Sequence, residues 1–103
     1  MADEFQTKLS GETLHVVVSI PRLDASSAAL LKQHLSQVLE PGVKRAEIDL
    51  GAVQFIDSSG IGVLLSIYRK LPEDGSGILL RGVSPGVMAV IELLRLHRVF
   101  KFE

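Results

Sequence analysis

The segment VQFIDSSGIGVLL, residues 53–65, sets a polar cluster between two apolar runs and marks where a loop becomes a helix. Asp57 is the predicted N-cap, because its carboxylate can accept hydrogen bonds from otherwise unpaired N–H groups of the first turn. Ser58 and Ser59 then fall beside the positive end of the helix dipole, which tolerates a phosphate. A phosphate would add about 1.5 to 2 negative charges next to Asp57, so we expect a charge switch with little refolding. Asp-Ser-Ser-Gly is also an ordinary capped helix start, and the pattern alone leaves both interpretations open.

The helix that follows is predicted to extend from Asp57 to Leu71. Its apolar residues recur at helical spacing and cover much of its circumference, which indicates a helix packed against a sheet. These residues are Ile61, Val63, Leu64, Leu65, Ile67, Tyr68 and Leu71. Gly60 and Gly62 each cost up to ~1 kcal/mol relative to Ala inside a helix. They therefore indicate close approach of another group, either from the chain's own sheet or from a partner.

On both sides of this segment, strand and helix patterns alternate along the chain. The expected elements are strands at 4–9 and 13–20, a helix at 25–39, strands at 45–50 and 78–81, a helix opened by Ser84-Pro85, and a last strand at 99–102. Residues 51–56 are expected to form a loop, and residues 73–77 a turn. With the helix above, the order is ββαβαβαβ, which predicts a mixed β-sheet packed by about three main helices, an α/β (mixed α+β) fold. We expect one domain over residues 1–103.

Local signals define the ends of the other two helices. Asp24 is the predicted N-cap of the first helix, which stops at Pro41-Gly42. In the helix after Ser84, the predicted buried stripe comprises Val87, Val90, Ile91 and Leu94. Met88, Leu93 and Leu96 lie off that stripe, and we expect them to be partly exposed.

The composition restricts the classes of function. The 103 residues include 11 Lys plus Arg and 12 Asp plus Glu, for a formal net charge of -1, and there is no Trp. With no basic stripe and few aromatic side chains on which bases could stack, nucleic-acid binding is not expected. The absence of Cys excludes disulfides, thiolate nucleophiles and Cys-based metal sites. The start lacks a signal-peptide pattern, and the apolar runs are far shorter than the ~20 residues of a membrane span. We therefore expect a cytoplasmic protein without direct membrane insertion.

Enzymatic chemistry has little support in the sequence. A serine hydrolase would combine Ser58 or Ser59 with Asp57 and one of three histidines, which are His15, His34 and His97. The Gly-x-Ser-x-Gly elbow is missing, and the histidines lack the paired spacing of metal ligands. Gly60-Ile61-Gly62 also lacks the Gly-Lys-Ser/Thr ending of a phosphate-binding loop. We expect no enzyme activity, no catalytic or metal-binding residue and no cofactor.

Residues 53–65 resemble the signature of STAS domains, specifically of bacterial anti-sigma factor antagonists. Leu23-Asp24, Val83-Ser84-Pro85 and residues 96–102 match as well, so the resemblance spans nearly the whole chain. It implies a mixed sheet packed by helices and a partner switch. The unphosphorylated protein would bind an anti-sigma factor that is an ATP-binding serine kinase of histidine-kinase-like fold, and thereby free the sigma factor. Phosphorylation by that kinase would inactivate the protein, and a PP2C-type phosphatase would restore it.

The resemblance also implies residue roles. Ser58 corresponds to the phosphoacceptor, and Asp24 and Asp57 to an acidic pair that helps engage the kinase. The implied partner-binding residues are Asp24, Asp57, Ser58, Ser59, Gly60, Ile61 and Gly62. The family commonly has Gly two residues before the Leu-Asp pair, where this chain has Pro21-Arg22, so a changed loop shape and partner choice are expected. The alternative is a constitutive STAS subunit of a membrane transporter ATPase complex, such as a lipid transporter.

Overall fold

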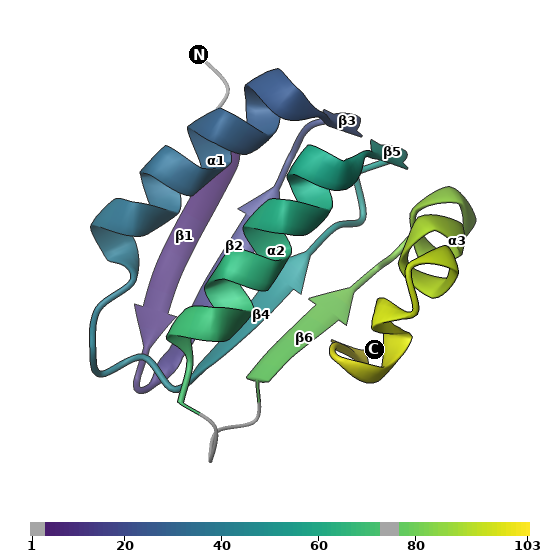
Figure 1. Cartoon of the computed structure of the whole chain (residues 1–103). Helices are drawn as coiled ribbons and strands as arrows, with labels where there is room; N and C mark the ends of the chain where they lie inside the picture. Colours follow the sequence, from purple (N-terminus) through teal and green to yellow (C-terminus); the bar gives the residue numbers. More distant parts are fainter. Residues whose placement is uncertain (1–3, 73–76) are drawn as a thin grey trace.

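The computed structural model describes residues 4–72 and 77–103. A five-stranded sheet forms its centre, in the order β1-β2-β4-β6-β7 (Figure 1). The strands are β1 (Phe5–Ser10), β2 (Thr13–Val18), β4 (Arg45–Asp49), β6 (Gly77–Arg81) and β7 (Lys101–Phe102). β1 is antiparallel to β2 and the other neighbours are parallel, which confirms the predicted mixed sheet. Apart from Gly77, the turn predicted at 73–77 lies outside the described residues.

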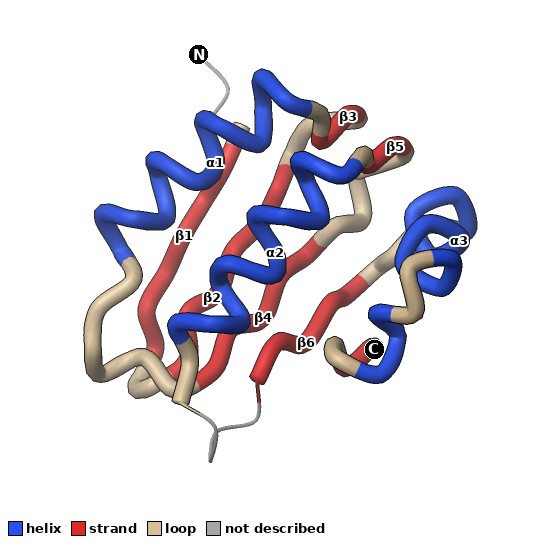
Figure 2. The backbone as a smooth tube through the Cα atoms, in the orientation of Figure 1, coloured by secondary structure: helices blue, strands red, loops and turns tan. Residues whose placement is uncertain are grey.

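Helices α1 (Ala25–Val38) and α2 (Ser58–Lys70) lie side by side over one face of the sheet (Figure 1). Helix α3 (Pro85–Leu93) lies beyond β6 and is followed by a short 3₁₀ turn, η1 (Leu96–Arg98), as Figure 2 shows. The three main helices and their places in the chain order are those predicted. No helix within the described ranges is long and apolar enough to cross a membrane.

The core fills the space between the helices and the sheet. Gly11, with φ +62°, allows the tight turn that joins β1 to β2 and so fixes the strand register. Alternate residues of the central strands then face the helices and are almost completely buried. They are Leu14, Val16 and Val18 of β2, Ala46 and Ile48 of β4, and Ile78 and Leu80 of β6.

The opposite face of the sheet carries an ion-pair ladder across neighbouring strands. Arg81 Nη2 lies 2.7 Å from Glu103 Oε1, and Arg81 Nη1 lies 3.3 Å from Glu47 Oε1. His15 Nδ1 lies 3.7 Å from the same Glu47 oxygen. The hydrogen bond that Arg81 donates to Glu103, followed by the negative charge of Glu103, raises the pKa of Arg81. These charged side chains alternate with the buried residues of β4 and β6, so they lie on the face of the sheet opposite α1 and α2.

The loop prediction for residues 51–56 is wrong at its end, where a second, two-stranded sheet forms. β3 (Arg22–Leu23) pairs in parallel with β5 (Phe55–Ile56). The Pro21 carbonyl accepts hydrogen bonds from the N–H groups of Gln54, at 2.8 Å, and Phe55, at 3.0 Å. These bonds and the burial of Leu23 and Ile56 fix the segment that enters α2.

Two residues predicted to be buried are largely exposed. Tyr68 is 42% exposed, and its ring borders Gly77 at the start of β6. Leu94 is 48% exposed because α3 ends there and Arg95, with φ 58°, turns the chain away. Leu93, expected to be partly exposed, is 81% exposed.

Candidate functional site

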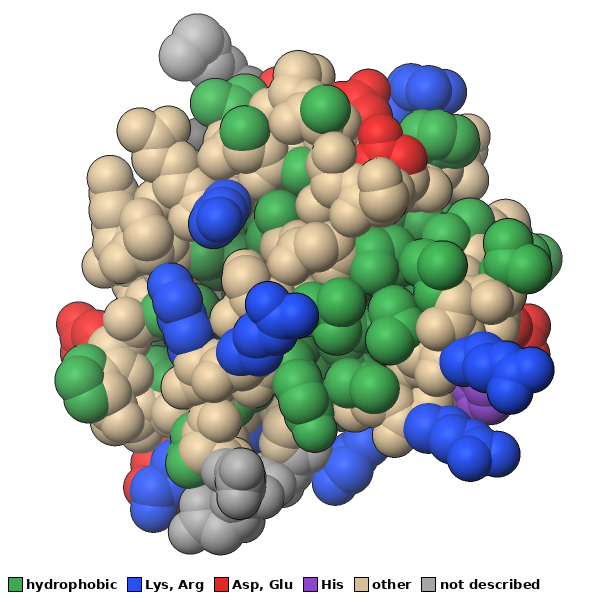
Figure 3. Space-filling view, viewed as in Figure 1, with side chains coloured by type: hydrophobic (Ala, Val, Ile, Leu, Met, Phe, Trp, Pro, Cys, Tyr) green, Lys and Arg blue, Asp and Glu red, His purple; other side chains and the backbone are tan. Residues whose placement is uncertain are grey.

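The small sheet brings the starts of α1 and α2 together. β3 leads directly into α1 and β5 directly into α2, and the parallel register pairs Leu23 with Ile56. The next residue on each strand is an N-cap aspartate, Asp24 or Asp57. Acidic side chains gather at this end of the molecule in Figure 3. Two sequence-distant carboxylates thus share one surface.

Asp57 caps α2 as predicted. Its Oδ1 accepts a hydrogen bond from the Ser59 N–H at 2.8 Å and another from the Gly60 N–H at 3.2 Å. Ser58 is the first residue of α2 and is exposed. Its hydroxyl makes no hydrogen bond to any residue that the structure describes, so it is accessible for chemical modification.

Asp24 caps α1, also as predicted, within a reciprocal network. Its Oδ1 accepts from the Ser27 N–H at 3.4 Å and from Ser26 Oγ at 3.0 Å, while its own N–H donates to Ser27 Oγ at 2.9 Å. The hydrogen bond from the Ser27 backbone, followed by that from the Ser26 hydroxyl, lowers the pKa of Asp24. The carboxylate is therefore ionised at neutral pH.

Gly60 and Ile61 lie beneath the surface. A Cβ on Gly60 would stand 2.6 Å from Ile56 Cγ1 and 2.7 Å from the Leu23 carbonyl oxygen. The close neighbour inferred from this glycine is therefore the chain's own small sheet. Ile61 is only 4% exposed and belongs to the core. Both residues seat the first turn of α2.

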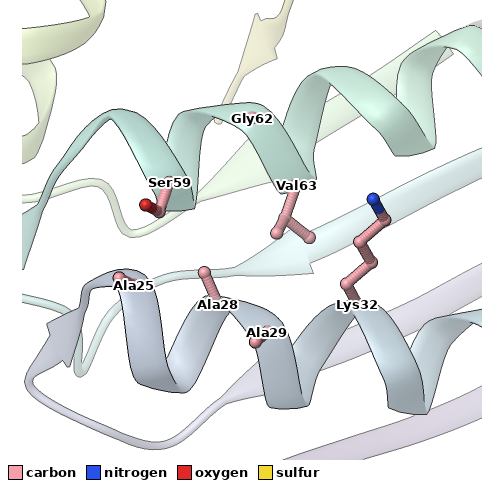
Figure 4. A pocket seen from close by; sticks show the side chains of 7 residues that line it. All are labelled: Ala25, Ala28, Ala29, Lys32, Ser59, Gly62 and Val63. Atoms are coloured by element: carbon pink, nitrogen blue, oxygen red, sulfur yellow. The ribbon is translucent and has the colours of Figure 1, made fainter.

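Gly62 faces a different environment, an open groove of about 310 Å³ between α1 and α2. A Cβ on Gly62 would meet nothing within 4 Å. Small side chains line the groove near the helix starts, and Lys32 stands at its other end (Figure 4). The lining residues are Ala25, Ala28, Ala29, Lys32, Ser59, Gly62 and Val63.

Phe55 was not among the candidate site residues, and Arg22 was noted only as part of a departure from the family pattern. The Arg22 guanidinium carbon lies 4.1 Å from the centroid of the Phe55 ring. Arg22 Nε lies 3.8 Å from Asp24 Oδ2. Because side chains alternate along a strand and Leu23 is buried, Arg22 and Asp24 lie on the outer face of the small sheet. The alternation of exposed and buried side chains could have indicated this in the sequence, but a strand of two residues is too short to show it.

Comparisons with known proteins agree with this architecture. The family profile described as "Mlab, STAS domain" matches residues 5–101. The anti-sigma-B factor antagonist of Listeria monocytogenes is 30% identical over 95 residues, which cover 89% of this chain and 82% of that protein.

Solved structures give the same result. An anti-sigma factor antagonist from Mycobacterium paratuberculosis superposes with a TM-score of 0.80 at 26% identity, covering 95% of this chain and 82% of that one. Bacillus SpoIIAA, described as an anti-sigma factor antagonist, superposes in its unphosphorylated form with a TM-score of 0.77 at 24% identity, covering 96% of this chain and 87% of that one. This chain therefore belongs to the STAS domain family of bacterial anti-sigma factor antagonists.

Proposed function

We propose that this protein is a phosphorylation-controlled anti-sigma factor antagonist. In its unphosphorylated form it binds an anti-sigma factor that is also a serine kinase, and the sigma factor is released. The kinase then phosphorylates Ser58, and the complex dissociates. The observation that carries this proposal is the exposed Ser58 hydroxyl at the start of α2, without an internal hydrogen bond among the described residues. SpoIIAA, which has the same fold, is described in both unphosphorylated and phosphorylated forms.

The negative charge around Ser58 explains how phosphorylation would change partner binding. Asp24 and Asp57 already make this surface acidic, so a partner that binds it presents basic groups. Phosphorylation adds about 1.5 to 2 further negative charges and a tetrahedral group. The added bulk and charge disrupt the fit to the partner, while the exposed position of Ser58 lets the phosphate point into solvent without disturbing the fold. A PP2C-type phosphatase would reverse the change.

The proposed contact surface combines polar and small residues. Asp24, Asp57, Ser58 and Ser59 supply its polar groups, and Gly62 keeps the groove between the helices open. Gly60 and Ile61 support this surface from below. The role is that of a regulatory binding protein, not an enzyme.

A pull-down from lysate of the source organism tests the proposal, with the parent protein and Ser58→Glu as parallel baits. We expect the parent to recover a small histidine-kinase-like ATPase and Ser58→Glu to lose it, although a carboxylate imitates a phosphate incompletely. Transporter ATPase components retained on both baits would contradict the proposal and indicate the constitutive subunit.

The acceptor is tested separately with the recovered kinase and labelled ATP. Ser58→Ala should not be phosphorylated, whereas the matched control Ser59→Ala should be. Equal phosphorylation of Ser58→Ala and the parent would show that the acceptor is another residue.

A further inference from the structure

Arg22 lies beside the acidic pair Asp24 and Asp57. Neighbouring side chains hold it in place, but its hydrogen-bond donors remain available to a partner. Its stacking on Phe55, at 4.1 Å, and its approach to Asp24, at 3.8 Å, restrict the side chain from two sides. The side chain nevertheless remains 62% exposed. Across the described part of the chain, its guanidinium donates no hydrogen bond.

A guanidinium presents five N–H donors in a planar fork, which matches the two oxygens of a carboxylate. Fixing a long side chain before binding removes part of the entropy that association would otherwise cost. Arginine and aromatic residues are also enriched among the residues that dominate binding energies. Arg22 on Phe55 therefore has the chemistry and the preorganisation of a specific contact.

We propose that Arg22, held by Phe55, is a specificity-determining contact of the partner-binding surface and recognises a carboxylate of the anti-sigma partner. This inference rests on the proposed function, because it assigns one further residue to the same surface. Arg22 shares the outer face of the small sheet with Asp24, so the surface continues from the helix starts onto β3 and β5. On this part of the surface Arg22 is a cation beside two anions, Asp24 and Asp57. A partner must then place an acidic side chain next to its basic ones.

The arrangement also explains how a departure from the family pattern is accommodated. Pro21 at this position lacks an N–H, but its carbonyl accepts hydrogen bonds from the N–H groups of Gln54 and Phe55. That pairing brings Arg22 opposite Phe55. Charge patterns of this kind discriminate among similar partners, because a partner with a basic residue at the matching position would be repelled.

The test measures the affinity of the purified parent and variants for the ATPase that the parent recovers. We expect Arg22→Gln to weaken binding about tenfold, as for the loss of a charge-assisted hydrogen-bond pair. Arg22→Lys should restore only part of the affinity, because an ammonium group keeps the charge without the fork. Phe55→Leu, which leaves Arg22 in place without its stacking partner, should weaken binding about threefold by loss of preorganisation.

Arg69→Gln is the matched control, since it removes an exposed arginine at the other end of α2 and should leave the affinity unchanged. Thermal unfolding followed by circular dichroism verifies that each variant is folded. If the parent binds and Arg22→Gln binds equally well, the assignment of Arg22 is wrong while the proposed function stands. If the parent recovers no such ATPase, the proposed function itself fails.

Discussion

Substitution of the two α2 glycines by alanine should change stability in opposite directions. Gly60 and Gly62 lie two residues apart in the same helix, and the same methyl group is added at each. At Gly60 the new Cβ would stand 2.6 Å from Ile56 Cγ1 and 2.7 Å from the Leu23 carbonyl oxygen. The second neighbour is backbone, and it is tied into the small sheet, so neither can move freely. At Gly62 nothing lies within 4 Å of the new Cβ.

The magnitudes follow from these two environments. Overpacking at Gly60 should lower the free energy of unfolding by about 1–3 kcal/mol. The better helix propensity of alanine offsets at most ~1 kcal/mol of this loss. Because both contacts are shorter than 3.0 Å, the cost lies at the upper end of that range, and Gly60→Ala is expected to lower the free energy of unfolding by about 2 kcal/mol. Gly62→Ala should raise it by about 0.5–1 kcal/mol, because only the helix-propensity gain applies. For a domain of this size each kcal/mol shifts Tm by about 4–8 °C.

Urea unfolding followed by far-ultraviolet circular dichroism is the suitable assay, since the chain contains no Trp. The free energies of unfolding of Gly60→Ala and Gly62→Ala should lie on opposite sides of the parent value, with similar m-values. Two variants of equal stability, or a stabilised Gly60→Ala, would refute the view that Gly60 seats α2 on the small sheet. The added methyl of Gly62→Ala also enters the groove, so its partner affinity should fall although its stability rises.

Three further predictions concern the helix starts. Asp57→Ala should lower the free energy of unfolding by about 0.5–2 kcal/mol and Asp57→Asn by much less, because only Asn retains a capping oxygen, as urea unfolding would show. The lowered pKa of Asp24 means that its ionised form stabilises the fold above its unfolded pKa, and this contribution is lost as the pH falls through the lower folded value. Asp24→Asn should therefore weaken the fall of Tm on acidification below about pH 4, and an unchanged Tm profile would contradict this. Ser58→Glu should change stability by no more than about 1 kcal/mol, since an exposed acid at the first turn is favoured by the helix dipole and opposed by Asp57. A large loss of Tm would show that this substitution acts by unfolding.

The sequence predicted those parts of the molecule that depend on neighbours in the chain. Strands β2, β4 and β6 alternate because one face of the sheet is buried, and that period of two is visible in single segments. The caps Asp24 and Asp57 were predictable because a short acidic side chain bonds to N–H groups only two or three residues ahead.

What the sequence did not reveal depends on contacts between distant segments. Two-residue strands have no measurable period, so β3 and β5 are defined only by their pairing with each other. The exposure of Leu94 depends on the left-handed backbone of Arg95, which turns the chain away from the path of α3. The role proposed for Arg22 likewise depends on a ring that lies far away in the sequence.

The small sheet gives the site a rigid backbone beneath exposed side chains whose charge can change. Leu23 and Ile56 are only 0% and 2% exposed, and Gly60 packs against both of them. The backbone beneath the site is therefore held by the core. In the proposed function, a partner contacts the side chains that point outward from the small sheet, the exposed Ser58 and the groove between α1 and α2. A charge added at Ser58 therefore changes the electrostatics of the surface. It leaves intact the core contacts that hold the shape of that surface. Such a division allows a binding energy to change by several kcal/mol while folding stability, which is only about 5–15 kcal/mol for a domain, is preserved.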